Sequence, residues 1–395
     1  MGMYDHIKYL EAYECGKRST TEETCKPHAN NHKRIALFIK KHSCDLRFLS
    51  HQQKREENGS SKKKWTMRRS RAEFGSSSTA EEVTEGIDAS RITAIITGAT
   101  SGVGRETARI LSLRGAQVVI GARNVEAANH VKEAILQEAG PCARVHVIEL
   151  NISSLQSVRK FVLSFKAKNL PLNLLINNAG IMGCPFSLSA DGIELQFATN
   201  YLGHFLLTNL LLDKMKSTAA ESGIAGRIVN VSSMFYKYTY DTGIRMHKIN
   251  EESGYSAYKA YGQSKLAMIL HSNELARRFN QENVNITINS VHPGAVPTNL
   301  ARHSNILAFA TSIASKLLKS IPQGAATQCF VALHPSLDKV SGKYFSDCKE
   351  SITTGFAKDP ALAERLWQFS THLTSTKSLT KAFRERNESL ASRNS

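Results

Sequence analysis

The sequence predicts a single α/β domain built on a doubly wound parallel sheet with helices on both faces. Short apolar segments of strand length alternate with longer segments of helical periodicity over most of the chain. A glycine-rich turn over residues 98–104 joins the first of these strands to a long helix, and short polar motifs follow several later strands. Mostly apolar strands separated by helices indicate a parallel sheet, and such sheets bind ligands at the carboxyl ends of their strands.

The predicted elements follow one another from residue 78 to residue 345. A short helix comes first, capped by Ser78 or Thr79, because acidic residues occupy the next turn. The others are, in order, strand 91–97, helix 105–114, strand 117–121, helix 125–139, strand 144–150, helix 153–168, strand 172–176, helix 193–213, strand 226–231, helix 255–275, strand 284–291, helix 323–334 and edge strand 343–345.

Three regions follow from this pattern. Residues 1–72 are expected to form a disordered basic extension, and residues 73–355 the α/β domain. Residues 356–395 are expected to form a C-terminal helix and a frayed, charged tail.

The first 72 residues differ in composition from the rest of the chain. They hold 17 of the 51 Lys and Arg residues and 8 of the 34 acidic residues, a net charge of +9 out of +17. Such polar, irregular sequence is typical of a disordered segment. Two alternatives are a chloroplast transit peptide, although transit peptides contain few acidic residues, and a gene-model extension upstream of a true start at Met67.

Composition also argues against several functions. The basic runs contain few aromatic residues, so we expect no nucleic-acid partner. Cys25, His28 and His32 lack well-spaced partners, so we expect no metal site. The longest mainly apolar stretches, 35–39 and 205–212, are far below the ~20 residues that span a bilayer, and no secretory signal follows the start. Any membrane association is therefore expected to be peripheral.

The glycine-rich turn has the composition of a phosphate-binding site. It follows a buried strand and precedes a helix, with the spacing G-x-x-x-G-x-G. Glycines let the backbone approach a diphosphate closely, and the N-terminus of the helix directs N–H groups at it. The turn therefore predicts a Rossmann-type dinucleotide site, with contacts from Thr97, Gly98, Ser101, Gly102, Val103 and Gly104.

The charge of the side chain just beyond the second strand, after Ala122, indicates which dinucleotide binds. An acidic residue there would bind the ribose 2′-hydroxyl of NAD, whereas a guanidinium suits the 2′-phosphate of NADP. Arg123 occupies this position, and Arg105 is available from the helix after the glycine turn. The sequence favours NADP(H); the alternative is that Arg123 only faces solvent.

Tyr261 and Lys265 stand four residues apart in a predicted helix. Positions i and i+4 lie on one helix face. A free tyrosine has a pKa of about 10, and an adjacent cation favours the phenolate, so Lys265 is expected to lower the pKa of Tyr261. The pair would then donate and accept protons near neutral pH. The alternative is an amphipathic helix with a solvated lysine.

In this order and spacing, these motifs resemble the short-chain dehydrogenase/reductase family. The resemblance covers residues 85–350, about two-thirds of the chain. Besides the glycine turn and Tyr261-x-x-x-Lys265, it rests on Asn177-Asn178-Ala179-Gly180, Asn200, Ser232-Ser233 and Pro293-Gly294. Stretches 171–182, 198–208 and 227–233 are similar to the retinol-dehydrogenase-like branch. Residues 77–84 and 322–327 resemble plant members associated with the protein translocon of the chloroplast inner envelope.

The resemblance implies a role for each motif. Tyr261 would exchange a proton with the substrate, and Lys265 would lower the tyrosine pKa and hold the nicotinamide ribose. Ser233 would bind the substrate oxygen, Ser232 would be structural, and Asn200 would hold a water that links Lys265 to solvent. The remaining cofactor contacts implied are Asn178, Ala179, Gly180, Pro293, Gly294, Thr298 and Asn151, where the family usually has aspartate and where weakened binding is expected.

The predicted function is NADP(H)-dependent hydride transfer to or from a carbonyl or alcohol of a lipophilic substrate. Residues 235–254 match no motif of the family. Their aromatic residues would either line an apolar pocket or pack a loop: Phe235, Tyr236, Tyr238 and Tyr240.

An alternative is an NADP redox-sensing regulatory subunit of the chloroplast envelope import machinery. Residues 305–321 have the composition of a basic amphipathic helix that calmodulin could bind, and the same segment would otherwise be a lid over the substrate cleft. The expected location is the chloroplast inner envelope, peripherally, or else the cytoplasm. Members of the family are often homo-oligomers through the Tyr261 helix.

Overall fold

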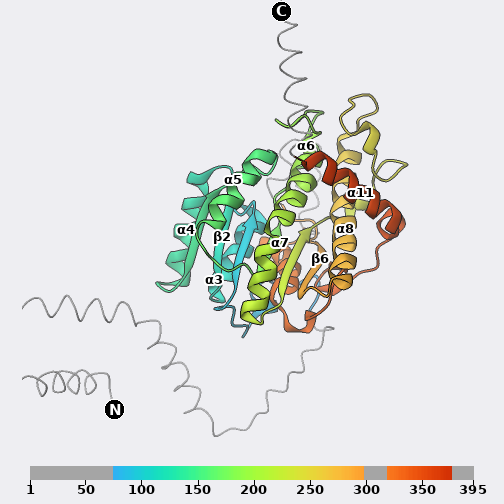
Figure 1. Cartoon of the computed structure of the whole chain (residues 1–395). Helices are drawn as coiled ribbons and strands as arrows, with labels where there is room; N and C mark the ends of the chain where they lie inside the picture. Colours follow the sequence, from blue (N-terminus) through green and yellow to red (C-terminus); the bar gives the residue numbers. More distant parts are fainter. Residues whose placement is uncertain (1–73, 298–317, 376–395) are drawn as a thin grey trace, which may run out of the picture. The chain divides into compact units, whose positions relative to one another are not determined.

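An eight-stranded sheet forms the centre of the computed structural model, which describes residues 74–297 and 318–375 (Figure 1). The strand order is β3-β2-β1-β4-β5-β6-β7-β8. Strands β1 to β7 run parallel, and β8 pairs antiparallel with β7. The strands are β1 (Thr93–Thr97), β2 (Gln117–Ala122), β3 (Arg144–Glu149), β4 (Leu174–Asn177), β5 (Gly226–Val231), β6 (Ile286–His292), β7 (Tyr344–Ser346) and β8 (Lys349–Glu350).

Helices cover both faces of the sheet and enclose two apolar cores. One core contains residues of α3 (Gly102–Leu113), α4 (Val125–Ala139) and α10 (Ile321–Leu333). The other contains residues of α5 (Leu155–Lys166), α7 (Gly203–Ser222), α8 (Ala257–Gln281) and α11 (Pro360–Thr374). Helix α11 lies beside α8 (Figure 1). The short elements are η1 (Glu82–Thr84), α6 (Leu195–Phe197), η2 (Ala198–Leu202), η3 (Met234–Lys237), η4 (Met246–Lys248), η7 (Pro335–Leu337) and η8 (Gly355–Lys358).

The strand order places a crevice between β1 and β4. Strand β1 pairs with β2 on one side and with β4 on the other, so the chain winds in opposite directions from this point. Ile96 of β1 lies opposite Ile176 of β4, and the two strands end side by side. In sheets of this type the crevice outside the carboxyl ends of such strands is where ligands bind.

The predicted fold class is confirmed, and the differences are local. The predicted helix at residues 79–83 is instead the short 3-10 helix η1. Thr79, which precedes η1, and Glu82 exchange hydrogen bonds: Glu82 N donates to Thr79 Oγ1 and Thr79 N donates to a Glu82 carboxylate oxygen. The predicted helix 193–213 is divided into α6, the π-helical segment η2 and α7, which extends to Ser222. Strand β8 was not predicted.

Some expectations fall on residues outside the described ranges. These include Thr298, the three candidate ligands between residues 25 and 32, and most of the segment 305–321. The division into an extension, an α/β domain and a C-terminal tail therefore stays a prediction at both ends. Within residues 74–297 and 318–375, no helix combines the length and apolar composition that crossing a bilayer requires.

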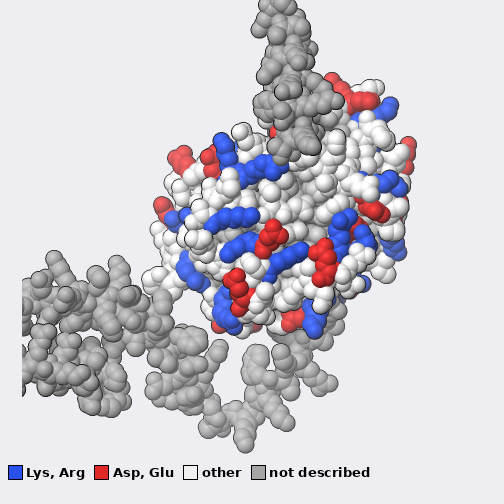
Figure 2. All heavy atoms as spheres, in the orientation of Figure 1, with Lys and Arg blue, Asp and Glu red and all other residues white. Residues whose placement is uncertain are grey.

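Charged side chains of both signs share the surface. On the face shown in Figure 2, Lys and Arg side chains are interspersed with Asp and Glu side chains. Nucleic-acid binding domains instead gather basic residues on one face. This face of the described part of the chain therefore has no basic patch of that kind.

Candidate active site

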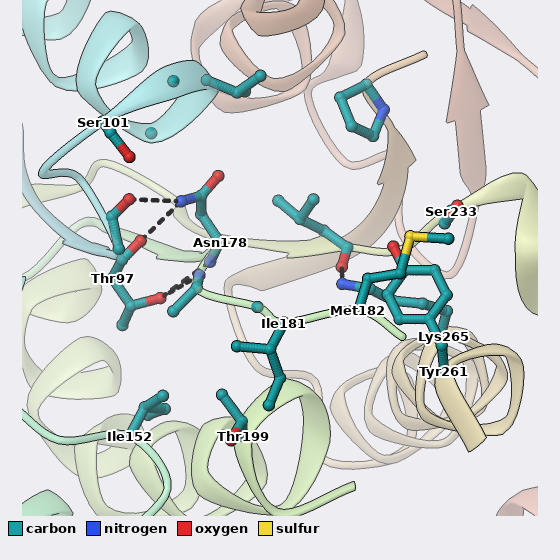
Figure 3. A pocket seen from close by; sticks show the side chains of 18 of the residues that line it. Thr97, Ser101, Ile152, Asn178, Ile181, Met182, Thr199, Ser233, Tyr261 and Lys265 are labelled. Atoms are coloured by element: carbon teal, nitrogen blue, oxygen red, sulfur yellow. Dashed lines mark hydrogen bonds between the residues drawn. The ribbon is translucent and has the colours of Figure 1, made fainter. Parts of the chain in front are cut away.

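A cavity of about 1150 Å³ opens at the carboxyl ends of the parallel strands (Figure 3). It collects residues from the glycine turn, from the segments after β2, β3, β4, β5 and β6, and from α8. Sixteen of the predicted site residues line it: Thr97, Gly98, Ser101, Gly102, Val103, Gly104, Arg123, Asn151, Asn178, Ala179, Gly180, Ser233, Tyr261, Lys265, Pro293 and Gly294. Asn200 is fully buried behind the lining.

The N-terminus of α3 borders this cavity without a side-chain cap. Ser101 is the N-cap residue, and its side chain accepts no capping hydrogen bond, whereas the N-cap side chains of α4, α5 and α8 do. Gly98 and Gly102 have φ values of 68° and 56°, which favour glycine. A Cβ atom on Gly98 would lie 2.7 Å from the Cα of Ala179. Backbone N–H groups here suit the diphosphate of a dinucleotide.

Thr97 and Asn178 join the ends of β1 and β4. The Thr97 hydroxyl accepts from the backbone N–H groups of Asn178 and Ala179, each at 2.9 Å. The Asn178 side chain donates to the carbonyls of Thr97 and Gly98 at 2.8 and 3.2 Å (Figure 3). Asn178 thus lines the cavity, while its amide nitrogen is used to hold the two strand ends together.

The opposite end of the cavity contains the predicted adenine and ribose contacts. Arg123 follows β2, is exposed and lines the cavity, whereas Arg105 is also exposed but is not part of the lining. The Oδ1 atom of Asn151 accepts from the Ser153 hydroxyl at 2.8 Å. An anion beside Arg123 would gain a charge-assisted hydrogen bond there.

Tyr261, Ser233 and Lys265 meet on the side of the cavity formed by β5 and α8 (Figure 3). The Ser233 hydroxyl lies close enough to the Tyr261 phenol to favour its phenolate form. The Lys265 Nζ lies 5.6 Å from the centre of the Tyr261 ring and donates to the Val231 carbonyl at 2.9 Å. A hydroxyl, a phenol and an ammonium can together bind and protonate a substrate oxygen.

Burial changes the acidity of this group in a direction that the sequence did not predict. It raises the pKa of Tyr261 to about 12, although the neighbouring Ser233 hydroxyl favours the phenolate. Burial also lowers the pKa of Lys265 to about 8. Without a bound cofactor, the pKa of Tyr261 therefore lies above its usual value, because burying a phenolate costs free energy. The lowering of this pKa by Lys265 beside a charged cofactor stays a prediction.

Asn200 lies in the π-helical segment η2, a type of turn found frequently at functional sites. Its side chain exchanges hydrogen bonds with the backbone of Ile181, accepting from N–H at 2.8 Å and donating to the carbonyl at 2.9 Å. A Cβ atom on Gly180 would lie 3.3 Å from the Asn200 Oδ1 and 3.5 Å from the Lys265 Nζ. The side chains of Asn200 and Lys265 therefore both pack against Gly180, on the side where a Cβ atom would lie.

Ser232 and the loop after it differ in role from Ser233. The Ser232 hydroxyl donates to the Lys265 carbonyl at 2.8 Å and so packs β5 against α8. In the loop, Phe235 lines the cavity. Tyr236 is buried with its hydroxyl bonded to the Thr354 N–H, and Tyr238 is 52% exposed. Tyr240 stacks with the Arg245 guanidinium. Of the two expectations for these aromatics, pocket lining holds for Phe235 alone.

Several lining residues were missed by sequence reasoning. Ile152 and Thr199 are direct neighbours of predicted site residues, so their positions could have been inferred from Asn151 and Asn200. Met182, Pro185 and Leu195 carry no such signal, because they lie between motifs and reach the cavity only through the path of the chain after β4.

The stability of the fold is expected to fall as pH drops below about 6.5. Burial lowers the pKa of His204 to about 4, of His271 to about 3 and of His292 to about 4. The unfolded chain binds protons at these histidines that the folded chain does not, so each should cost about 2 kcal/mol between about pH 7.5 and pH 5. Denaturant unfolding at both pH values measures the change.

Carboxylates also change stability with pH. Burial raises the pKa of Glu194, so protonation of this group stabilises the fold as pH falls, opposite to the histidines. A histidine variant separates the two contributions. His271→Gln should show a smaller loss of stability between the two pH values than the wild type. His130→Gln, at an exposed position, should retain the full loss. Equal losses in all three proteins would contradict the assignment to buried histidines.

Known proteins are similar to this chain in sequence and in fold. Residues 92–306 match the family model described as short chain dehydrogenase. The chain is 60% identical over 301 residues to short-chain dehydrogenase TIC 32 B, chloroplastic, from Brassica napus, covering 76% of this chain and 94% of the relative. Retinol dehydrogenase 14 from Mus musculus is 43% identical over 291 residues, covering 70% and 84%. A crystal structure of an uncharacterized Mycobacterium paratuberculosis protein matches with a TM-score of 0.58 and 32% identity, covering 74% and 96%.

Proposed function

Because the chain belongs to the short-chain dehydrogenase/reductase family of oxidoreductases, we propose that it is an NADP(H)-dependent enzyme that reduces a carbonyl or oxidises an alcohol. The observation that carries this proposal is the meeting of Tyr261, Ser233 and Lys265 at a cavity whose other end holds Arg123. The uncapped α3 N-terminus lies between them in the same lining and fits a dinucleotide diphosphate.

The bound nicotinamide would supply the hydride. In the direction of reduction, the Ser233 hydroxyl and the Tyr261 phenol donate hydrogen bonds to the substrate oxygen and stabilise the negative charge that develops on it. The phenol is protonated at neutral pH, since burial raises the pKa of Tyr261 to about 12. Its proton can therefore pass to an alkoxide, which is a stronger base than a phenolate.

Lys265 has a second part in this chemistry. Its pKa of about 8 leaves the side chain mostly protonated at pH 7, so its positive charge stabilises the phenolate that remains after proton transfer. Asn200 packs against Gly180, as Lys265 does, and would hold the water that returns a proton to the site. The predicted nicotinamide-end contacts Pro293 and Gly294 line the same region of the cavity.

The substrate side of the cavity supports a lipophilic substrate. Met182, Pro185, Leu195 and Phe235 line it, and Met234 beside them is 58% exposed. Apolar lining with few convergent polar groups is typical of sites for apolar small molecules. The relatives named retinol dehydrogenase fit this class.

Binding and turnover assays test the proposal. NADPH and NADH are titrated by fluorescence, and each is then supplied with retinal, steroid ketones and small ketones as substrates. We expect tighter binding of NADPH and measurable oxidation of it by at least one lipophilic carbonyl. A purified, folded protein that binds neither nucleotide would refute the function.

Reversing the charge of Arg123 should shift the cofactor preference. Arg123→Asp is expected to weaken NADPH binding by about 10- to 100-fold, because a charge-assisted hydrogen bond to the 2′-phosphate becomes a repulsion. NADH binding should stay the same or improve, since an acid suits the ribose 2′-hydroxyl. The matched control is Arg105→Asp, which makes the same charge change outside the cavity lining. Equal losses of NADPH affinity in both variants would leave Arg123 without a specific role.

A chloroplast location, peripheral to the inner envelope, is proposed from the relatives named TIC 32, chloroplastic. A second candidate function rests on the same relatives: a redox-sensing subunit of the envelope translocon. Cross-linking in isolated chloroplasts, with NADPH or NADP added, tests both. Recovery of the protein in the stroma without cross-links would contradict both. Calcium-dependent capture on calmodulin tests the role predicted for residues 305–321.

A further inference from the structure

His204 contacts the proposed active site from inside the protein. It is the second residue of α7, and its side chain is fully buried. The ring Nδ1 lies 3.0 Å from the carbonyl oxygen of Asn200, and the ring Nε2 lies 2.8 Å from the Thr97 hydroxyl. One imidazole thus connects the π-helical segment η2 to the end of β1. We call this Thr97–His204–Asn200 connection the histidine link.

The partners of the ring determine its tautomer. A carbonyl oxygen only accepts hydrogen bonds, so Nδ1 must carry the proton and donate to Asn200. A neutral ring then has an acceptor at Nε2, and the Thr97 hydroxyl donates to it. Burial favours the neutral ring and lowers the pKa of His204 to about 4. The charge of Lys265 also disfavours protonation of the ring, whereas the hydrogen bond to the Asn200 carbonyl favours it.

This tautomer matters because the Thr97 hydroxyl has no spare capacity. Its oxygen already accepts from the N–H groups of Asn178 and Ala179, which uses both lone pairs. Its single proton is directed to His204. A donor at Nε2 would compete with those two N–H groups and loosen the backbone that lines the cofactor end of the cavity.

At its Nδ1 end, the histidine link holds Asn200, which lies on the side of the cavity that contains Lys265. The Asn200 side chain holds the backbone of Ile181 through two hydrogen bonds, and its carbonyl is held by His204. Ile181 and Ala179 flank Gly180, against which Asn200 and Lys265 both pack. We propose that His204 is a positioning residue that sets the cofactor-binding backbone at Ala179 and the proton-relay residue Asn200 in register through its two ring nitrogens. This inference rests on the proposed function.

Two variants each keep one half of the link. His204→Asn keeps a donor near the Nδ1 position and loses the acceptor for Thr97. We expect it to weaken NADPH binding about 10-fold while kcat at saturating cofactor changes less than about 3-fold, since a buried hydroxyl loses its partner. His204→Gln keeps an acceptor near Nε2 and loses the donor to Asn200. It should bind NADPH normally and lose about 10-fold in kcat. His204→Phe should show both losses.

A histidine that serves only the stability of the fold would give a different result. A merely structural histidine would lower the unfolding midpoint of all three variants and leave NADPH affinity and kcat unchanged, or change both alike in the Asn and Gln variants. Unfolding midpoints are measured for each variant so that affinity and kcat are compared only among folded proteins.

A measurement on the wild type does not depend on the proposed function. Imidazole 15N–1H spectra should show His204 protonated at Nδ1 only, from about pH 8 to about pH 5, with the signal assigned by its absence in His204→Asn. A proton on Nε2 would refute the link whatever the activity. If the wild type bound no nicotinamide nucleotide but showed the Nδ1 tautomer, the proposed function and the cofactor role of the link would fail while the bonding scheme stood.

Discussion

Replacing Tyr261 with phenylalanine is expected to lower kcat by about 10³-fold or more, within the range attributed to a positioned acid or base. Phenylalanine keeps the ring and its edge-to-face packing on Phe235, whose ring centre is 5.8 Å away. It removes the hydroxyl that lies beside Ser233 and would protonate the substrate. NADPH affinity should change only a few-fold, because most predicted cofactor contacts lie elsewhere in the cavity.

The matched control is Tyr236→Phe. It removes the same atom from a buried tyrosine near the site, where the hydroxyl only accepts from the Thr354 N–H and the ring packs on Tyr344. We expect its kcat to stay within a few-fold of the wild type. Steady-state kinetics and NADPH fluorescence titration are measured on both proteins. Near wild-type turnover by Tyr261→Phe would end the assignment of Tyr261 as the proton donor.

The sheet could be predicted because each of its parallel strands is marked by residues that are close together in the sequence. Each parallel strand is a short apolar segment between helices, and the residues that follow a strand meet at one edge of the sheet. This is why motifs as distant as Thr97, Asn178, Ser233 and Gly294 were expected to lie together and do line one cavity. This rule predicts which residues gather at the edge of the sheet. It does not predict which of their atoms form hydrogen bonds with one another.

The features that were missed depend on distant contacts. The bond from Thr97 to His204 joins residues 107 positions apart, and no local pattern marks His204 among the apolar residues around it. The π-helical segment was read as ordinary helix, because one extra residue in a turn leaves the apolar spacing almost unchanged. The acidity of Tyr261 depends on burial by surrounding elements, and the Tyr-x-x-x-Lys spacing does not reveal that burial.

Gly262, directly after Tyr261, should be as intolerant of change as the catalytic residues. A Cβ atom there would lie 1.7 Å from the carbonyl oxygen of Tyr238 and 2.8 Å from that of Phe235. Alanine favours an α-helix over glycine by about 1 kcal/mol, so helix propensity alone would predict stabilisation. Here the obstacle is backbone, which cannot rotate away as a side chain would. We expect Gly262→Ala to lower stability by about 3 kcal/mol, at the upper end of typical overpacking costs.

The same variant should also lower kcat, by about 10²-fold. The backbone that must move is that of Phe235 in η3 and of Tyr238 just after it. Because η3 begins directly after Ser233, we expect the Ser233 hydroxyl to shift relative to the Tyr261 phenol. Loss of one aligned donor to a developing oxyanion costs about 10²- to 10³-fold. Gly75→Ala is the control, because its Cβ would have no neighbour within 4 Å. Unfolding midpoints and kcat are measured for both.

An unchanged kcat in a destabilised Gly262→Ala protein would mean that Ser233 keeps its place while the rest of η3 moves. The contact would then serve packing alone. A loss of kcat at a temperature where the variant is fully folded would show instead that the size of residue 262 sets the spacing between the Ser233 hydroxyl and the Tyr261 phenol. The geometry favours the second result, because the Phe235 carbonyl that a Cβ would meet is two residues from Ser233 and its ring packs on Tyr261.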